Sequence, residues 1–438
     1  MIRKSQQMKD AGTRASEDWK KQEDRKTGET AAEEGRRGNY MTSKKKTETE
    51  RADRSVLSAD GKECLEGRRA AEAFLSSLHG GCSAFSWETA DGQHLWGRNL
   101  DFNRLAEGTR VTFLPRKTVF YTYGTSLENT LREDTRTETI YGAVGIGSLL
   151  LKSTPALYEG INEEGLMGGQ LYYRGFAHFE RECRPGTRPV QPPFLITYLL
   201  GRCRNVEEVV RELQENITLS GAPMLGMVPT LHWMFADRTG ESVIVEPDRE
   251  GLHIYRNTMG VMTNSPGYPW HRTNLLTYAG LRDLDYDTLH INGDSLEQCF
   301  SGGGMKGLPG DWSSPSRFVR LSFLKKYCEK GRNEEEGVAR MLRLFDSAAF
   351  PLGMVRVSEP GTITEYDRGV TPFDYTVYTS VMCAESLRFY WLTYGNSRVR
   401  YVDLGELLKK NRAVQFELSF EQEFKRLGAE QDGLFPAG

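Results

Sequence analysis

One of the seven cysteines, Cys82, is followed at short spacing by Arg98 and Asp101 in the segment "GCSAFSWETADGQHLWGRNLDF". A nucleophilic thiol requires a proton acceptor and a positive field that favours the thiolate. Arg98 can supply the field, and Asp101 can hold an α-amino group, whose ordinary pKa of about 7.7–8.0 suits a proton acceptor. That amine exists only if Cys82 is the first residue. Taken alone, the three residues do not separate this chemistry from a buried, inert cysteine.

Two short strands joined by a turn are expected to position these residues. Residues 82–87 alternate in polarity, "ADG" at 90–92 is a turn signal, and 94–98 follow as a return strand. The resulting hairpin carries the arginine and the aspartate back toward the cysteine.

The remaining pattern alternates blocks of strands with blocks of helices. Strands are expected over residues 118–123, over 156–173 about a turn at 162–165, and over 231–237, 242–248, 252–257, 375–384, 388–395 and 398–404. Helices are expected over residues 193–203, 205–215 with Asn205 as the N-cap, 314–330 and 333–347. Blocks of this kind predict a layered α+β fold rather than a doubly wound parallel sheet.

Composition limits the class of protein. The chain has 438 residues, of which 38% are hydrophobic, so one large domain or two ordinary ones can form a core. A net charge of -3 gives no general case for nucleic acid or an anionic membrane as partner. No apolar run approaches the roughly 18 residues that span a bilayer. The cysteines stand singly, without a C-x-x-C pair, which argues against a disulfide framework or a metal cluster and predicts a cytoplasmic protein.

The first part of the chain differs in composition from the rest. Residues 1–55 contain no Val, Leu or Phe and are rich in charged residues, so we expect them to be disordered. Residues 56–78 could form a short amphipathic helix. We therefore expect residues 1–81 to be a leader that is removed or a misassigned start, and residues 82–438 to form the functional domain.

The segment that begins at Gly81 resembles the mature start of the choloylglycine hydrolases, the N-terminal-nucleophile group that contains bile salt hydrolases and penicillin V acylases. The segments "LYEGINEEGLMGGQLYY", "ESVIVEPD", "GVMTNSPGYPWHRTNL", "LPGDWSSPSRFVR" and "YTVYTSVMCAES" resemble the family in the same order. The resemblance implies a four-layer αββα fold, with two antiparallel sheets between helix layers. It also implies a homotetramer and neither a cofactor nor a metal.

The resemblance assigns roles to five residues. Cys82 matches the nucleophile, and Arg98 and Asp101 match the "GRNxD" residues. Asn264 in "TNSP" matches an oxyanion-hole amide, and Arg317 in "SPSRFVR" matches the arginine that completes the site. A positioned side-chain N–H contributes roughly 2.7–4 kcal/mol to stabilising a tetrahedral oxyanion.

Tyr172 in "QLYYRGF" decides between substrates within the family. Bile salt hydrolases carry Asn where Tyr172 stands, whereas penicillin V acylases of Gram-positive type resemble "LYY". A phenol ring offers a flat face to a phenoxyacetyl group, although it is equally compatible with plain packing.

These observations predict a cysteine N-terminal-nucleophile amidase that hydrolyses a small-molecule acyl amide through an acyl thioester on Cys82. Penicillin V acylase is the preferred activity. Conjugated bile acid hydrolase and acyl-homoserine lactone acylase are the alternatives. The non-enzyme alternative is an unprocessed protein whose charged tail binds a partner.

Overall fold

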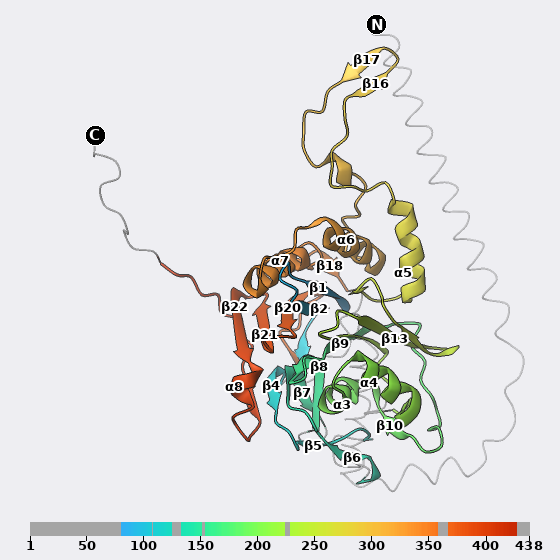
Figure 1. The fold of residues 1–438 in the computed structure, drawn as a ribbon, viewed down its shortest axis with the longest axis vertical. Coiled ribbons are helices and arrows are strands. Elements are labelled where there is room, and N and C mark those ends of the chain that lie inside the picture. Colours follow the sequence, from blue (N-terminus) through green and yellow to red (C-terminus); the bar gives the residue numbers. More distant parts are fainter. Residues whose placement is uncertain are drawn as a thin grey trace, which may run out of the picture. The chain divides into compact units, whose positions relative to one another are not determined.

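The computed structural model describes residues 80–106, 108–124, 133–150, 154–223, 228–357 and 367–426. The disorder expected of residues 1–55 and the helix expected over 56–78 lie outside the described residues. Two antiparallel sheets form the centre of the described chain (Figure 1).

The first sheet has seven strands and contains the predicted hairpin. Its strand order is β15 (Val261–Met262), β1 (Gly81–Glu88), β2 (His94–Phe102), β20 (Phe373–Cys383), β21 (Arg388–Thr393) and β22 (Asn396–Asp403), with β18 (Val355–Arg356) also pairing with β20.

The second sheet has eight strands and contains the predicted pair about the turn at 162–165. Its strand order is β14 (Gly251–Tyr255), β13 (Ser242–Asp248), β12 (Leu231–Ala236), β9 (Met167–Tyr172), β8 (Thr154–Asn162), β7 (Ala143–Leu150), β4 (Arg110–Leu114) and β23 (Val414–Phe416).

Short elements and helices complete the described chain. The helices are α3 (Leu195–Arg202), α4 (Val206–Arg211), α5 (Tyr268–Asn274), α6 (Ser314–Tyr327), α7 (Glu334–Asp346) and α8 (Leu404–Leu407). The small strand pairs are β10 (Arg188–Val190) with β11 (Ile217–Leu219), β16 (Leu289–Ile291) with β17 (Asp294–Leu296), β19 (Asp367–Arg368) with β3 (Leu105–Ala106), and β5 (Val119–Tyr121) with β6 (Arg136–Glu138).

Helices pack on both large sheets. Helices α6 and α7 contact β1, and α7 also contacts β2 and β20, so they cover the seven-stranded sheet (Figure 1). Helix α3 contacts β8 and β9 of the eight-stranded sheet, while β9 also contacts β1 and β2 of the other sheet. The predicted α+β class with antiparallel sheets is therefore confirmed.

Strand β12 is apolar at five of its six positions because both of its faces are covered. Leu231, Trp233 and Phe235 point into the cluster beneath α3 and α4, whereas Met234 and Ala236 belong to the cluster that includes the residues of β1 and β2. Because successive side chains of a strand face opposite sides, a strand that is covered on both faces is largely apolar, and the exception in β12, His232, is buried against Glu246.

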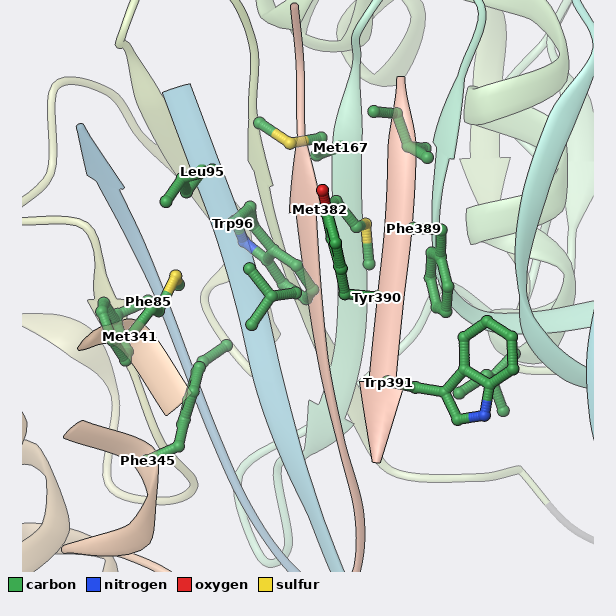
Figure 2. Packing of buried hydrophobic residues seen from close by; sticks show 14 of the residues in the cluster. Phe85, Leu95, Trp96, Met167, Met341, Phe345, Met382, Phe389, Tyr390 and Trp391 are labelled. Atoms are coloured by element: carbon green, nitrogen blue, oxygen red, sulfur yellow. The ribbon is translucent and has the colours of Figure 1, made fainter. Parts of the chain in front are cut away.

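The two sheets approach closely near the start of β2. Figure 2 shows Trp96 of β2 among the buried side chains of this core, with Met167 and Met382 nearby. A Cβ atom on Gly169 of β9 would lie only 2.5 Å from Cη2 of the Trp96 ring. Glycine at this position therefore lets the indole pack directly against the backbone of the opposite sheet.

The helices differ from the predicted ranges at their ends. Asn205 caps α4, because its side chain accepts a hydrogen bond from Glu208 N, as predicted. The chain then widens into a single π-helical turn over Glu212–Asn216 in place of a continued α-helix.

Helix α5 and the β16–β17 hairpin were not predicted, because the Gly and Pro residues around them obscure a clear hydrophobic period.

In the part of the chain that the structure describes, no helix combines the length and the apolar character needed to cross a bilayer.

Candidate active site

The β1–β2 hairpin brings Arg98 to the sulfur of Cys82. Cys82 lies opposite Leu100, and Arg98 lies opposite Ala84, two residues further along β1. The Arg98 Nη2 group donates a hydrogen bond to Cys82 Sγ at 2.8 Å. Both side chains are buried, each with 1% of its surface exposed, so the contact lies away from water.

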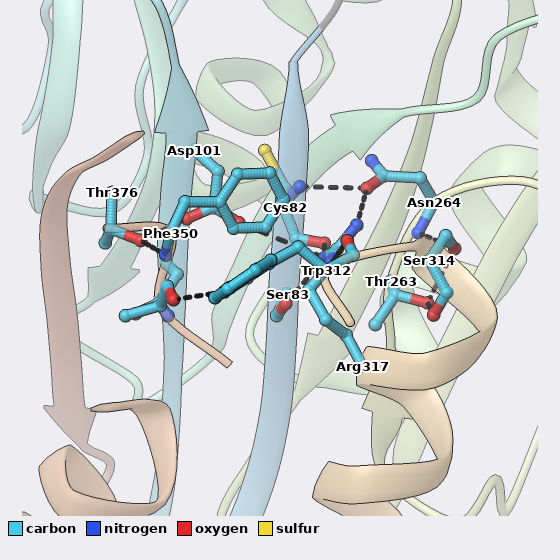
Figure 3. Close-up of polar contacts among 12 residues, drawn as sticks. Cys82, Ser83, Asp101, Thr263, Asn264, Trp312, Ser314, Arg317, Phe350 and Thr376 are labelled. Atoms are coloured by element: carbon cyan, nitrogen blue, oxygen red, sulfur yellow. Dashed lines mark hydrogen bonds and ion pairs between the residues drawn. The ribbon is translucent and has the colours of Figure 1, made fainter. Parts of the chain in front are cut away.

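Asp101 lies one residue pair from Cys82, opposite Gly81 in the ladder. Its Oδ1 atom accepts a hydrogen bond from Thr376 Oγ1 at 2.5 Å (Figure 3). Its Oδ2 atom is buried and accepts no hydrogen bond among the described residues, although Arg317 Nη1 lies 3.9 Å from it as an ion-pair partner. Burial raises the pKa of Asp101 to about 6, and the attraction of Arg317 acts in the opposite direction.

Asn264 follows β15 and approaches the nucleophile through its side-chain oxygen. The Cys82 backbone N–H donates to Asn264 Oδ1 at 2.9 Å, and Asn264 Nδ2 donates to the carbonyl oxygen of Tyr172 at 2.9 Å. We expected Asp101 to hold the Cys82 nitrogen. In the chain that continues through Gly81 this nitrogen is a peptide N–H with one hydrogen, and it binds Asn264 instead.

The backbone of Asn264 is held by the two segments that follow it. Its N–H donates to Ser314 Oγ at 2.9 Å, and its carbonyl oxygen accepts a hydrogen bond from His271 Nε2 at 2.9 Å. Burial lowers the pKa of His271 to about 4, so the ring is neutral near pH 7. A neutral imidazole has one N–H, which must be on Nε2 here because a carbonyl only accepts.

Arg317 lies in the first turn of α6 and connects the nucleophile strand to Asn264. Its Nη1 atom donates to Cys82 O at 2.5 Å and to Ser83 Oγ at 2.7 Å, and its Nη2 atom donates to Asn264 Oδ1 at 2.7 Å (Figure 3). The guanidinium also lies over the ring of Phe350, at 5.2 Å from its centroid. One planar guanidinium therefore holds the Cys82 carbonyl, the Ser83 hydroxyl and the Asn264 amide in place.

The cysteine thiol is not activated in the chain that retains Gly81. Burial raises the pKa of Cys82, while the charges of Arg98 and Arg317 lower it. The burial effect dominates, so the neutral thiol is favoured.

A pocket of about 320 Å³ lies beside this cluster, and its lining includes Gly80, Gly81, Tyr172, Asn264, Arg317 and Asp374. A Cβ atom on Gly81 would lie 2.7 Å from Cζ of Phe350. The two glycines that precede Cys82 therefore fit closely against the pocket wall. Two larger pockets, of about 550 and 660 Å³, have none of the six predicted site residues in their linings.

The six predicted residues thus gather around one point, although they come from separate parts of the sequence. The sequence was compared with models of known protein families. The model of linear amide C-N hydrolases, choloylglycine hydrolase family, matches residues 82–410. The chain belongs to the choloylglycine hydrolase family.

Curated relatives within the family match most of the chain. A bile salt hydrolase/transferase of Clostridium perfringens is 30% identical over 327 residues, which cover 74% of this chain and 93% of the relative. A bile salt hydrolase/transferase of Lactiplantibacillus plantarum is 28% identical over 346 residues, which cover 78% of this chain and 98% of the relative.

Solved structures of the family have the same fold. A mutant of conjugated bile acid hydrolase from Clostridium perfringens matches with a TM-score of 0.69 and 27% identity, covering 79% of this chain and 100% of that chain. A penicillin V acylase from Agrobacterium tumefaciens matches with a TM-score of 0.58, 20% identity and coverage of 76% and 90%, which is a likeness of fold. As a member of this family, the chain is a hydrolase of linear amide C-N bonds.

Sequence reasoning missed a buried acid behind the nucleophile. Glu159 of β8 has no exposed surface, and its Oε2 atom accepts hydrogen bonds from Arg98 Nη1 at 3.1 Å and from Tyr378 OH at 3.0 Å. Burial raises the pKa of Glu159 to about 7, and the Arg98 charge opposes this shift. A charged residue within the apolar run "ALYEGI" was the available signal, because an unpaired charge in a buried strand is costly.

Proposed function

We propose that this member of the choloylglycine hydrolase family cleaves the amide bond of conjugated bile acids. The observation that carries the proposal is the contact of Arg98 with Cys82 Sγ, in a chain that is 30% identical over 327 residues to a bile salt hydrolase/transferase. This choice reverses the preference that the sequence suggested, because the curated bile salt relatives are more similar than the penicillin V acylase structure.

The proposed reaction passes through an acyl thioester on Cys82. The Cys82 sulfur attacks the amide carbonyl carbon, and Arg98 stabilises the thiolate. The free α-amine of Cys82 takes the thiol proton and gives it to the leaving nitrogen as the C–N bond breaks. Water then attacks the thioester, which releases the carboxylic acid and restores the thiol. Asp101, whose Oδ2 atom accepts no hydrogen bond among the described residues, would bind the α-ammonium.

Asn264 is proposed to stabilise the tetrahedral intermediate. Its Nδ2 atom has two hydrogens, and one donates to the carbonyl oxygen of Tyr172. The second has no acceptor recorded among the described residues, and Asn264 lines the pocket beside Cys82. An N–H that points into this pocket can bind the oxyanion. Arg317 would keep the amide in this orientation through Asn264 Oδ1.

We further propose that the residues before Cys82 are removed to form the active enzyme. The family match begins at Cys82, and the peptide N–H of that residue cannot act as a base. Loss of Gly80 and Gly81 would free the α-amine and enlarge the pocket that they line. Intact mass and N-terminal sequencing of the protein expressed from its own upstream region test this step. An active enzyme that still carries Met1 would contradict it.

Tyr172 supports penicillin V as a second candidate substrate. Its ring lies 6.2 Å from that of Phe102, centroid to centroid, and lines the same pocket. A flat acyl group can stack on such a wall.

A substrate panel distinguishes the two candidates. Glycocholate, taurocholate, penicillin V and an acyl-homoserine lactone are compared by the release of free amine, with Cys82→Ala as the inactive control. The highest kcat/KM is expected for glycocholate or taurocholate. Turnover of penicillin V alone would favour the second candidate, and no turnover by the enzyme that begins at Cys82 would contradict the proposal.

Three broader features belong to the same proposal. The four-layer αββα arrangement is supported by three sets of contacts: α6 and α7 pack on one sheet, the two sheets pack on each other, and α3 packs on the second sheet.

The β16–β17 hairpin supports assembly into a homotetramer. Its apolar side chains Leu289, Ile291 and Leu296 are about half exposed, and a second copy of the chain could bury them. Light scattering of wild type and of Ile291→Asp tests the assembly. The scattered single cysteines support a cytoplasmic location.

A further inference from the structure

Glu159 connects the two sheets directly behind the nucleophile. It lies on β8 of the eight-stranded sheet, and its side chain has no exposed surface. Its three hydrogen-bond donors belong to the other sheet: Arg98 Nη1 at 3.1 Å, Tyr378 OH at 3.0 Å and Ser380 Oγ at 3.3 Å. A buried carboxylate with a guanidinium and two hydroxyl partners is a well-satisfied group.

The Arg98 guanidinium has different partners at its two ends. Its Nη1 atom is bound to Glu159 and to the carbonyl oxygen of Gln170, at 2.8 Å, and both partners lie in the eight-stranded sheet. Its Nη2 atom donates to Cys82 Sγ at 2.8 Å, within its own sheet. Because the guanidinium is planar and rigid, the group that fixes Nη1 also fixes the position of Nη2.

Glu159 is the only carboxylate within ion-pair distance of Arg98 among the described residues. Removal of one partner from a buried pair leaves the other charge uncompensated, so it moves toward other acceptors or water. The carbonyl of Gln170 would remain, but a neutral acceptor holds a guanidinium less strongly than a carboxylate does.

We propose that Glu159 is a positioning residue that sets the reactivity of the Cys82 thiol by holding Arg98 against the sulfur. It acts through Arg98 and does not contact the substrate. The inference rests on the proposed role of Cys82 as nucleophile, but the reactivity of the thiol can be measured without any substrate.

A matched control lies elsewhere in the chain. Glu334, at the start of α7, is 8% exposed and accepts hydrogen bonds from Ser386 Oγ at 2.6 Å and from Tyr390 OH at 2.8 Å. Arg388 lies at 3.8 Å from its carboxylate. It therefore has the same kinds of partners as Glu159, without a recorded contact to the Cys82 cluster.

The experiment compares Glu159→Leu and Glu159→Gln with Glu334→Leu and Glu334→Gln in the full chain, with the N-terminus of each purified protein determined by intact mass. Iodoacetamide alkylation of Cys82 is followed by peptide mass as a function of pH. Where amide hydrolysis is present, kcat and KM are measured separately. Circular dichroism confirms folding.

We expect Glu159→Leu to move the alkylation profile to higher pH by about one unit, because Arg98 no longer favours the thiolate. We expect kcat to fall by about tenfold to a hundredfold with a smaller change in KM, since a displacement of about 1 Å at the reacting group has effects of that size. Glu159→Gln keeps an oxygen acceptor, so it should show the same shift at smaller size. The Glu334 variants should keep the wild-type profile.

The direction of the shift makes the test decisive. If Glu159 were only a nearby negative charge, its removal would favour the thiolate and move the profile to lower pH. A shift to lower pH, or an unchanged profile, in folded Glu159→Gln would overturn the positioning role, even if Glu159→Leu fails to fold. Wild-type enzyme that begins at Cys82 and lacks amide hydrolysis would contradict the proposed function, and the alkylation profile would still decide this inference.

Discussion

Arg317 Nη2 donates to Asn264 Oδ1 at 2.7 Å, and this contact fixes which way the asparagine amide faces. The two ends of an amide side chain have nearly the same shape, so their assignment depends on the neighbouring donors and acceptors. Arg317 can only donate, and the Cys82 backbone N–H points to the same oxygen. The amide nitrogen of Asn264 must therefore face Tyr172 and the pocket.

Replacement of Cys82 by alanine should abolish amide hydrolysis in a folded protein. The thiolate is the attacking group, so we expect the rate to fall by at least about a thousandfold. Steady-state assays with the best substrate of the panel measure the loss, and circular dichroism checks the fold. Cys328→Ala, which removes a half-buried thiol away from the site, should retain activity. Retained activity in Cys82→Ala would contradict the thioester mechanism.

Replacement of Arg98 by glutamine should move the acid limb of kcat/KM to higher pH. The charge of Arg98 lowers the pKa of the Cys82 thiol, so its loss should raise that pKa. The α-amine and the thiol share a proton, so the limb reports the pair and not one residue. Profiles of kcat/KM against pH are compared with those of Arg256→Gln, a charge change at a surface ion pair. An unchanged acid limb would show that Arg98 does not act on the thiol.

Replacement of Tyr172 by asparagine should lower the ratio of penicillin V turnover to glycocholate turnover. The change exchanges an aromatic wall for an amide of the kind that bile salt hydrolases carry. We expect a change of about tenfold, which corresponds to the loss of one aromatic contact of about 1.4 kcal/mol. The two kcat/KM values are measured on the same preparation. A ratio that rises or stays constant would show that Tyr172 does not select the substrate.

Replacement of Asp101 by asparagine should stabilise the chain that retains Gly81, but only above about pH 6. Burial raises the pKa of Asp101 to about 6. The folded state therefore binds this proton more tightly than the unfolded state. The resulting stabilisation is present below about pH 4 and is lost as the pH rises through about 6.

The Cys82→Ala variant is compared with the double variant that also carries Asp101→Asn. The free energy of unfolding of each is measured in urea, after intact mass confirms that Gly81 is retained. The free energy of unfolding should rise by about 1–3 kcal/mol at pH 8 and change little at pH 4. Equal destabilisation at both pH values would mean that Asp101 stabilises the fold in its ionised form.

The local parts of the site were predictable from the sequence. Cys82 and Arg98 lie on adjacent strands joined by a short turn, so alternation and turn residues were enough to bring them together. Asn205 was recognisable as a cap because its side chain and the following acidic turn form a local signal. The resemblance to known proteins, and not spacing, supplied Asn264 and Arg317.

The contacts between sheets were not predictable in the same way. Glu159 and Arg98 are 61 residues apart and meet only because β2 and β8 belong to different sheets that pack face to face. No periodicity encodes which residue of one sheet faces which residue of another. The binding of the Cys82 nitrogen to Asn264 was missed for a related reason, since it depends on the chain continuing through Gly81.

The close approach of Trp96 to Gly169 gives the core a direct influence on the chemistry. Trp96 precedes Arg98 by two residues on β2, and Gly169 precedes Gln170, whose carbonyl oxygen binds Arg98. The indole packs where a Cβ atom on Gly169 would lie. A methyl group at this position would also lie only 2.9 Å from Cβ of Glu159, so it would press apart the two sheets that hold the Arg98 guanidinium without reaching Cys82 itself.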